Sequence, residues 1–204
     1  IRKIRSNYQK AFYAYVAFSF ISFAFIFSFG EPLLSFAFGQ KYADSTSSVQ
    51  LMFLSIFVFP TLFLQANIII AMKHEKNDMY FNIVALVIHL ALCLIGLSFN
   101  KSLDVVNYSI LISFIAFHVL QDGLLLRSGL TTIPKCASFY LISICFVWMY
   151  RFISHEYGEI TVFFGSVITV VAIYLIGPAR KLLQTENTNN SSVVDDNPKG
   201  IKRS

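Results

Sequence analysis

Charged residues are scarce in this chain of 204 residues. Asp, Glu, Lys and Arg make up 13% of the sequence, whereas an average soluble domain carries about 25%. Hydrophobic residues make up 56%, and the mean hydropathy is +0.64. A water-soluble core of this size could not bury so much apolar surface, so the composition excludes an ordinary soluble domain.

The few charges are missing from long blocks and concentrated between them. A single charge at mid-bilayer costs about 2.5–3.5 kcal/mol even on insertion scales, and each block is close to the roughly 20 apolar residues that a helix needs to cross a bilayer core. Transmembrane strands would instead give segments of about ten residues in which apolar and polar side chains alternate. The six charge-free blocks are residues 11–30, 45–72, 79–100, 105–121, 136–150 and 160–179.

These blocks predict an all-α integral membrane protein with about six transmembrane helices. We expect a cytoplasmic basic juxtamembrane segment over residues 1–10 and a transmembrane helical lobe over 11–183. A disordered cytoplasmic tail should follow over 184–204, because that segment is polar and has no period. The expected helices cover about residues 11–29, 49–72, 79–99, 105–126, 136–150 and 160–176.

Cysteine is also scarce, and the spacing that disulfide frameworks and metal sites need is missing. Cys93, Cys136 and Cys145 form no CxxC pair and have no accompanying His cluster. They are either inert packing residues, as lone buried thiols usually are, or reactive thiols. The enzyme motifs GxGxxG, GxxxxGK, HExxH and GxSxG are absent as well. We therefore predict no catalytic, cofactor-binding or metal-binding residue.

Lys and Arg are unequally distributed between the two predicted sides of the membrane. With a cytoplasmic N-terminus, thirteen of the sixteen lie on the cytoplasmic side and three on the other. This bias predicts that both termini are cytoplasmic, and it explains the net charge of +5 without a nucleic-acid partner. The cytoplasmic set is Arg2, Lys3, Arg5, Lys10, Lys73, Lys76, Arg127, Lys135, Arg180, Lys181, Lys199, Lys202 and Arg203, and the outer set is Lys41, Lys101 and Arg151.

Proline and glycine interrupt the first two predicted helices. Gly30 to Pro32 break the pattern of the first, and the short apolar stretch at 33–38 either extends that helix or lies along the outer interface, ending at Gly39. Pro60 lies at the centre of the second, with Thr61 and Gln65 on one face just beyond it. Pro60 is either a hinge that lines a cavity or an architectural kink.

The fourth predicted helix carries the main ionisable pair within the crossings. His118 and Asp122 lie four residues apart on one face, with Gln121 alongside. Buried ionisable groups in membrane helices are costly and often face a cavity. The pair is therefore either a proton- or cation-coupling site, or an interfacial carboxylate within reach of Arg127 or water, with the histidine bonded to a neighbouring helix. Pro60, Thr61, Gln65, His118 and Asp122 are the candidate substrate and ion pathway.

The order of features over about residues 10–100 resembles one transporter family. Glu31-Pro32-Leu33-Leu34 and Phe38-Gly39-Gln40-Lys41-Tyr42 are followed by an apolar helix that closes at Ala71-Met72-Lys73-His74-Glu75-Lys76. This pattern resembles the lipid-linked oligosaccharide flippases, which export O-antigen and polysaccharide within the MATE-like MOP superfamily.

The resemblance implies a function and a setting. The chain would be the C-terminal lobe of a flippase with 12–14 helices in the bacterial cytoplasmic (inner) membrane. It would export undecaprenyl-diphosphate-linked oligosaccharide or polysaccharide repeat units by alternating access, coupled to H⁺ or Na⁺. Its partners would be the lipid bilayer, the glycan substrate, an N-terminal lobe of the same chain and polysaccharide assembly proteins.

Two other functions stay open at the level of sequence. A membrane-embedded enzyme of polysaccharide assembly, such as an acyltransferase or polymerase, needs catalytic groups that converge in large loops, and the predicted loops are short. A structural membrane subunit is the other alternative. We expect a transporter and not an enzyme.

Overall fold

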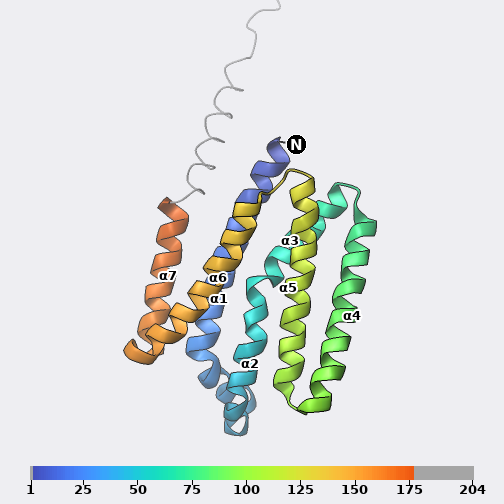
Figure 1. The fold of residues 1–204 in the computed structure, drawn as a ribbon. Coiled ribbons are helices and arrows are strands. Elements are labelled where there is room, and N and C mark those ends of the chain that lie inside the picture. Colours follow the sequence, from blue (N-terminus) through green and yellow to red (C-terminus); the bar gives the residue numbers. More distant parts are fainter. Residues whose placement is uncertain (1, 177–204) are drawn as a thin grey trace, which may run out of the picture.

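The computed structural model describes residues 2–176, apart from the side chains of residues 2, 3, 43, 44 and 174–176. Over this range the chain is helical and contains no strand (Figure 1). The elements are α1 (Arg2–Phe38), η1 (Gln40–Ser45), α2 (Thr46–Phe53), η2 (Leu54–Phe57), α3 (Phe59–Ala71), α4 (Glu75–Phe99), α5 (Leu103–Arg127), α6 (Ile133–Tyr157) and α7 (Glu159–Ile176), of which η1 and η2 are 3-10 helices.

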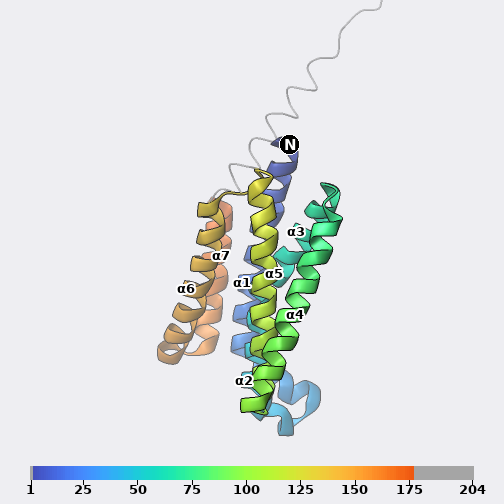
Figure 2. The ribbon, with the colours of Figure 1, turned by 45° about the vertical axis from the view of Figure 1, so that its right-hand side comes forward.

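Within residues 2–176, five segments are long and apolar enough to cross a membrane. They are α1 from Ile4, the combined α2–η2–α3 segment over Thr46–Ala71, and the helices α4, α5 and α6. The remaining apolar helix, α7, is shorter. The helices stand side by side in two views of the bundle (Figures 1 and 2), and α4 packs along α5 while α1 packs against α7. The protein is thus all-α, and its composition fits a membrane.

Several helices run beyond the charge-free blocks, and α1 and α6 do so by the longest stretches. α1 continues through Pro32 to Phe38 and ends at Gly39, whose φ of +90° suits a residue without a Cβ atom. The stretch at 33–38 therefore extends the helix. α6 likewise continues past Arg151 to Tyr157. Lack of charge marks membrane depth, whereas a helix can project beyond the hydrocarbon into water. The predicted tail over 184–204 lies outside the described residues.

The second predicted crossing is broken in the middle. α2 passes into the 3-10 helix η2, and α3 begins at Phe59 with Pro60 in its first turn. Pro60 has no backbone N–H to donate to the carbonyl of Ile56, and its ring disfavours continuous α-helix at this point. The Val58 amide instead donates to the Ser55 carbonyl at 3.1 Å, the tighter spacing of a 3-10 turn. The predicted proline kink is thus a change of helix type.

Successive connections alternate between the two ends of the bundle. The start of α1 and the α3–α4 and α5–α6 connections lie at one end, whereas η1 and the α4–α5 and α6–α7 connections lie at the other (Figure 1). We call the first the basic end and the second the opposite end. The basic end carries Arg5, Lys73, Lys76, Arg127 and Lys135, and the opposite end carries Lys41, Lys101 and Arg151. This arrangement matches the predicted alternation, and the membrane sidedness stays a prediction.

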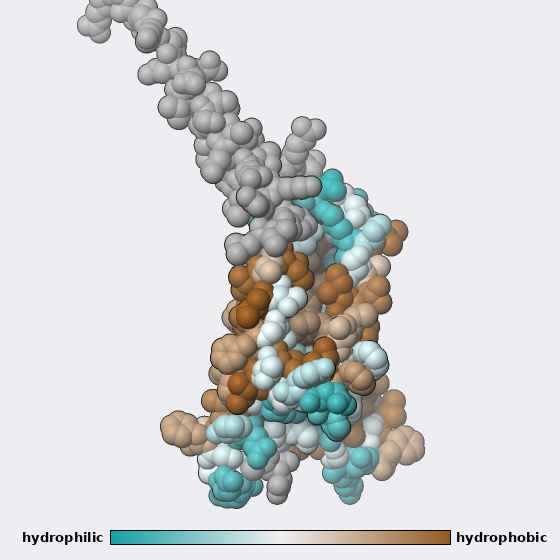
Figure 3. Space-filling model, turned by 90° about the vertical axis from the view of Figure 1, so that its left-hand side faces the viewer, coloured by the Kyte–Doolittle hydropathy of each residue, from teal (hydrophilic) through white to brown (hydrophobic). Residues whose placement is uncertain are grey.

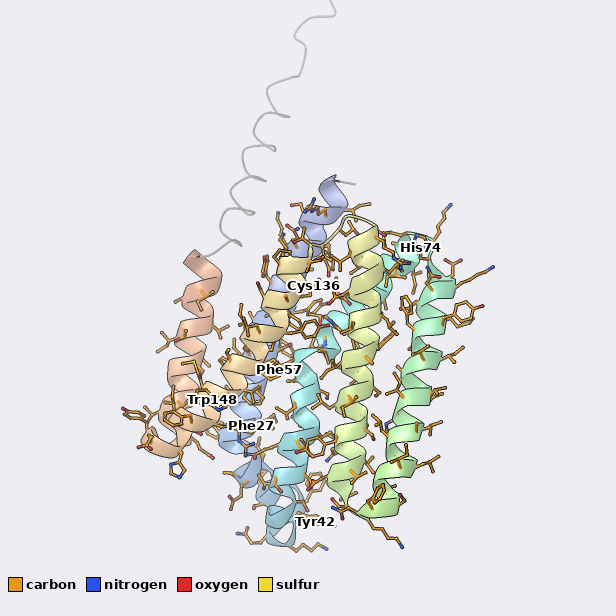
Figure 4. The ribbon with its side chains drawn as sticks, in the orientation of Figure 1. Phe27, Tyr42, Phe57, His74, Cys136 and Trp148 are labelled. Carbon is orange, nitrogen blue, oxygen red and sulfur yellow. The ribbon has the colours of Figure 1, made fainter. Side chains whose placement is uncertain are left out.

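A cluster of aromatic rings holds α1, η2 and α6 together. The ring centroids of Phe20 and Phe146 lie 4.5 Å apart, and those of Phe23 and Phe57 lie 4.9 Å apart. Tyr150 is buried beside them, and its hydroxyl lies 3.0 Å from the Ala24 carbonyl oxygen. Phe57 lies within the break between α2 and α3 (Figure 4). Packed aromatic pairs contribute about 0.5–1.5 kcal/mol beyond their buried area, so this packing stabilises the observed position of the break against α1 and α6.

Candidate functional site

His118 and Asp122 lie one turn apart on the same face of α5, and both are buried. His118 is fully buried and Asp122 is 6% exposed. His118 Nδ1 lies 3.2 Å from Asp122 Oδ2. The sequence interpretation that pairs Asp122 with Arg127 differs from this arrangement, because the partners of Asp122 come from α3, α5 and α6. A carboxylate so deep in an apolar bundle is stable only with several donors around it.

Tyr140 of α6 bridges this pair. Its hydroxyl lies 2.6 Å from His118 Nδ1 and donates to Asp122 Oδ2 at 3.1 Å. Phe139 stacks on the His118 ring, with centroids 5.2 Å apart. The Tyr140 hydroxyl and the Phe139 ring of α6 thus both contact His118 of α5.

The first turns of α3 supply the other donors. Thr61 Oγ1 lies 2.9 Å from His118 Nε2, and Gln65 Nε2 donates to Asp122 Oδ1 at 2.8 Å. Thr61 and Gln65 are four residues apart, so both face α5, and both are fully buried. The Gln65 amide also makes a longer contact of 3.4 Å with the hydroxyl of Tyr8 in α1. Four helices thus converge on one polar network.

The protons in this network can be counted. The Tyr140 hydroxyl proton goes to Asp122, so His118 Nδ1 must carry a proton to donate to the Tyr140 oxygen. The Thr61 hydroxyl has one proton and lies 2.8 Å from the Val58 carbonyl oxygen and 2.9 Å from His118 Nε2. When it donates to Nε2, His118 is neutral. When it donates to Val58, Nε2 must be protonated and His118 is a cation.

Thr61 and His118 therefore have two hydrogen-bonding patterns that differ by one proton. The second pattern places an imidazolium next to a carboxylate in a dry interior, where opposite charges attract strongly. The Val58 carbonyl that accepts the Thr61 proton in that pattern belongs to the break before Pro60 and also accepts from the Leu62 amide at 2.9 Å. The position of one proton is thus connected to the broken segment.

Gln121 extends the polar region towards α4. Its side-chain amide donates to Asp78 Oδ1 at 2.9 Å. The amide oxygens of Gln121 and Gln65 are both buried without a hydrogen-bond partner. Burying an amide oxygen without a donor costs about 1–3 kcal/mol, so these two positions are where water or a polar ligand would be stabilised.

The structure brings together four of the five residues predicted for the pathway. Thr61, Gln65, His118 and Asp122 are in direct contact, and Pro60 precedes them in the first turn of α3. Sequence reasoning missed three further members of the region. Tyr8, Tyr140 and Asp78 carry its other hydrogen-bonding groups.

A second, smaller polar group lies between α4 and α5. The Ser109 hydroxyl is 3.1 Å from His89 Nδ1 and 2.8 Å from Cys93 Sγ. The three cysteines are free, and the described residues contain no group of three or more His, Cys, Asp or Glu side chains that could hold a metal ion. Cys93 is thus a packing residue with a hydroxyl partner, in keeping with the first of the two interpretations for it.

Comparison of this chain with protein-family models, with curated proteins and with solved structures gives no match in any of the three. The buried network is therefore interpreted from its own chemistry.

Proposed function

We propose that this chain is one lobe of a membrane transporter of the lipid-linked oligosaccharide flippase type, with His118 and Asp122 as its proton-binding pair. The observation that carries the proposal is the buried network of four helices around these two residues. The order of features at residues 31–42 and 71–76 supports the choice of flippase over other transporters. On this proposal the protein works in the bacterial cytoplasmic membrane and exports undecaprenyl-diphosphate-linked glycan.

The physical need for such a lobe follows from the substrate. A glycan headgroup cannot cross hydrocarbon unaided, so a transporter must offer a polar path that opens alternately to the two sides. Alternation requires a bistable element whose equilibrium depends on a bound ligand. The break at residues 54–58 is such an element on our proposal, because its Val58 carbonyl accepts the Thr61 proton in one of the two patterns.

A proton fits the site better than Na⁺ does. Sodium sites in transporters use oxygen atoms that point at the ion, including unwound backbone carbonyls. Here the Asp122 oxygens already face the N–H of Gln65 and the O–H of Tyr140. Donors of this kind stabilise a carboxylate and repel a metal cation, whereas the imidazole of His118 accepts a proton without displacing any partner.

The test is transport by the full-length protein in liposomes that contain a fluorescent polyprenyl-diphosphate-linked oligosaccharide. A quencher that cannot cross the membrane is added outside the liposomes. The rate at which label from the inner leaflet becomes quenched then measures flipping. We expect a proton gradient to accelerate flipping in the unchanged protein and to have no effect in Asp122→Asn. Glu156→Gln, at an exposed position on α6, is the matched control and should keep the response.

The outcomes separate the two parts of the proposal. Flipping indistinguishable from protein-free liposomes contradicts the transport function. Flipping that is equally fast with and without a proton gradient, or that responds equally in Asp122→Asn, contradicts the role of the pair.

A further inference from the structure

A cavity lies between α1, α6 and α7 and borders the buried network at Tyr8 and Asp122. Its volume is about 540 Å³, within the range of roughly 300–1,000 Å³ that is typical of ligand pockets. It is lined along α1 from Tyr8 to Phe20, along α6 from Pro134 to Phe146 and along α7 from Thr169 to Ile173. α6 and α7 meet at Gly158 and their other ends diverge in the view of Figure 1. The cavity occupies the half of the bundle nearer the basic end.

The depth of the cavity corresponds to one leaflet. The lining on α1 extends from residue 8 to residue 20, which is about 18 Å at a rise of about 1.5 Å per residue. Half of a typical hydrocarbon core is about 15 Å. The Phe20 and Phe146 rings, with centroids 4.5 Å apart, close the inner end. A hydrocarbon chain that enters from the basic end would therefore stop near the middle of the membrane.

The walls of the cavity are mostly apolar. Phe12 of α1 and Phe139 of α6 meet edge to face, with centroids 5.4 Å apart, and long side chains of this kind hold α6 away from α1. Seen from the α7 side, the middle of the molecule is predominantly hydrophobic between more hydrophilic ends (Figure 3). Apolar cavities do not hold water well, so the fitting occupant of this space is hydrocarbon.

Positive charge lies at the open end. Lys135 lines the cavity and its side chain is exposed, and Arg5 of α1 lies at the same end of the bundle. Two cations at this end would favour a phosphate. Asp122 also reaches the wall, but both of its oxygens accept hydrogen bonds from Gln65 and Tyr140 and it is 6% exposed. Its charge is thus directed into the network.

We propose that this cavity binds one anionic phospholipid of the leaflet at the basic end, with the phosphate at Lys135 and Arg5 and one acyl chain along the aromatic wall. Basic pockets between transmembrane helices on the cytoplasmic side are a recurrent site for anionic headgroups. A bulk phospholipid fits because the pocket is one leaflet deep. This site borders Asp122 of the pair, but it does not depend on the transport function proposed above.

Cys136 offers a direct test, because it lines the cavity next to Lys135 and lies near the same end as His74 (Figure 4). In a Cys93→Ala, Cys145→Ala background, the rate of maleimide labelling at Cys136 is measured in phosphatidylcholine nanodiscs with and without phosphatidylglycerol of the same chains. We expect phosphatidylglycerol to slow labelling several-fold, because only the unoccupied fraction reacts.

Two variants with matched controls identify the site. Lys135→Gln should abolish the protection, whereas Lys101→Gln at the opposite end should retain it. Ala17→Phe, which fills the cavity wall on α1, should abolish it too, whereas Ala14→Phe at an exposed position on the same helix should retain it. Each result is the ratio of labelling rates in the two lipid mixtures, so a change in the intrinsic reactivity of Cys136 cancels.

Equal labelling in the two lipid mixtures would overturn the proposal, as would protection that survives Lys135→Gln and Ala17→Phe. Protection by undecaprenyl phosphate in place of phosphatidylglycerol, with none by phosphatidylglycerol itself, would overturn the assignment to a bulk phospholipid.

Discussion

The side-chain amide of Gln65 in α3 donates to the carboxylate of Asp122 in α5 across 2.8 Å, with Gln65 fully buried and Asp122 6% exposed. This bond connects the helix that follows the break to the helix that carries His118 and Asp122. Any movement of α3 relative to α5 must break or remake it.

Replacing Gln65 with Ala should destabilise the protein by about 1–2 kcal/mol, because hydrogen bonds between membrane helices contribute about 0.6–2 kcal/mol and Asp122 would lose a donor. Thermal unfolding in detergent, followed by circular dichroism, measures the change. Asn67→Ala is the control, because Asn67 lies on the same helix with its side chain exposed. Equal stabilities of the two variants would show that the Gln65 bond contributes nothing.

Tyr140→Phe should be strongly coupled to Asp122→Asn. The Tyr140 hydroxyl touches both His118 and Asp122, so removing it after Asp122 has been neutralised should cost less than removing it from the intact network. Residues within one hydrogen-bond network show interaction energies of about 0.5–3 kcal/mol. A double-mutant cycle on unfolding free energy checks this. Additive effects would mean that the hydroxyl does not bridge the pair.

Pro60→Ala should make the second crossing more continuous. The new N–H at residue 60 can donate to the Ile56 carbonyl, so hydrogen exchange of the amides at 54–59 should slow by about five- to tenfold, since one added bond contributes about 1 kcal/mol. Pro32→Ala is the matched control, because α1 already continues through Pro32. Unchanged exchange at 54–59 would indicate that packing around Phe57, and not Pro60, causes the break.

Gly96→Ala should loosen the contact between α4 and α5. An added Cβ atom would lie 2.5 Å from Cγ1 of Val105, so the Val105 side chain or one of the two helices must shift. Overpacking of this kind costs about 1–3 kcal/mol. Gly123→Ala in α5 meets no atom within 4 Å and should be neutral or stabilise by up to about 1 kcal/mol. Unfolding free energies of the two variants decide the matter, and a stabilising Gly96→Ala would be inconsistent with the close approach.

The charge-free blocks located the helices because hydrocarbon tolerates few charges. They could not give the helix ends, since backbone geometry at Pro32 and beyond Arg151 is not limited by the membrane. Spacing placed His118 and Asp122 on one face, and likewise Thr61 and Gln65. The contact between these two faces is a tertiary contact, and a single sequence carries no signal for it.

The missed tyrosines have a similar explanation. Tyr140 lies within an apolar block, where an aromatic ring usually contributes packing, and its hydroxyl becomes informative only when α6 lies against α5. Tyr8 lies in the basic segment before the first block, yet that segment is the start of α1 and its ring is buried. A stretch interpreted as juxtamembrane thus supplies a wall of the site.

The proton-binding role of the pair is tested most directly by solid-state ¹⁵N NMR of histidine-labelled protein in lipid bilayers, with the His118 signals assigned by their absence from His118→Gln. If the proposal holds, acidification changes the His118 signals from one protonated nitrogen to two, and Asp122→Asn prevents this change. A His118 that keeps one protonated nitrogen throughout, or that titrates equally in Asp122→Asn, would contradict a shared proton at the centre of this network.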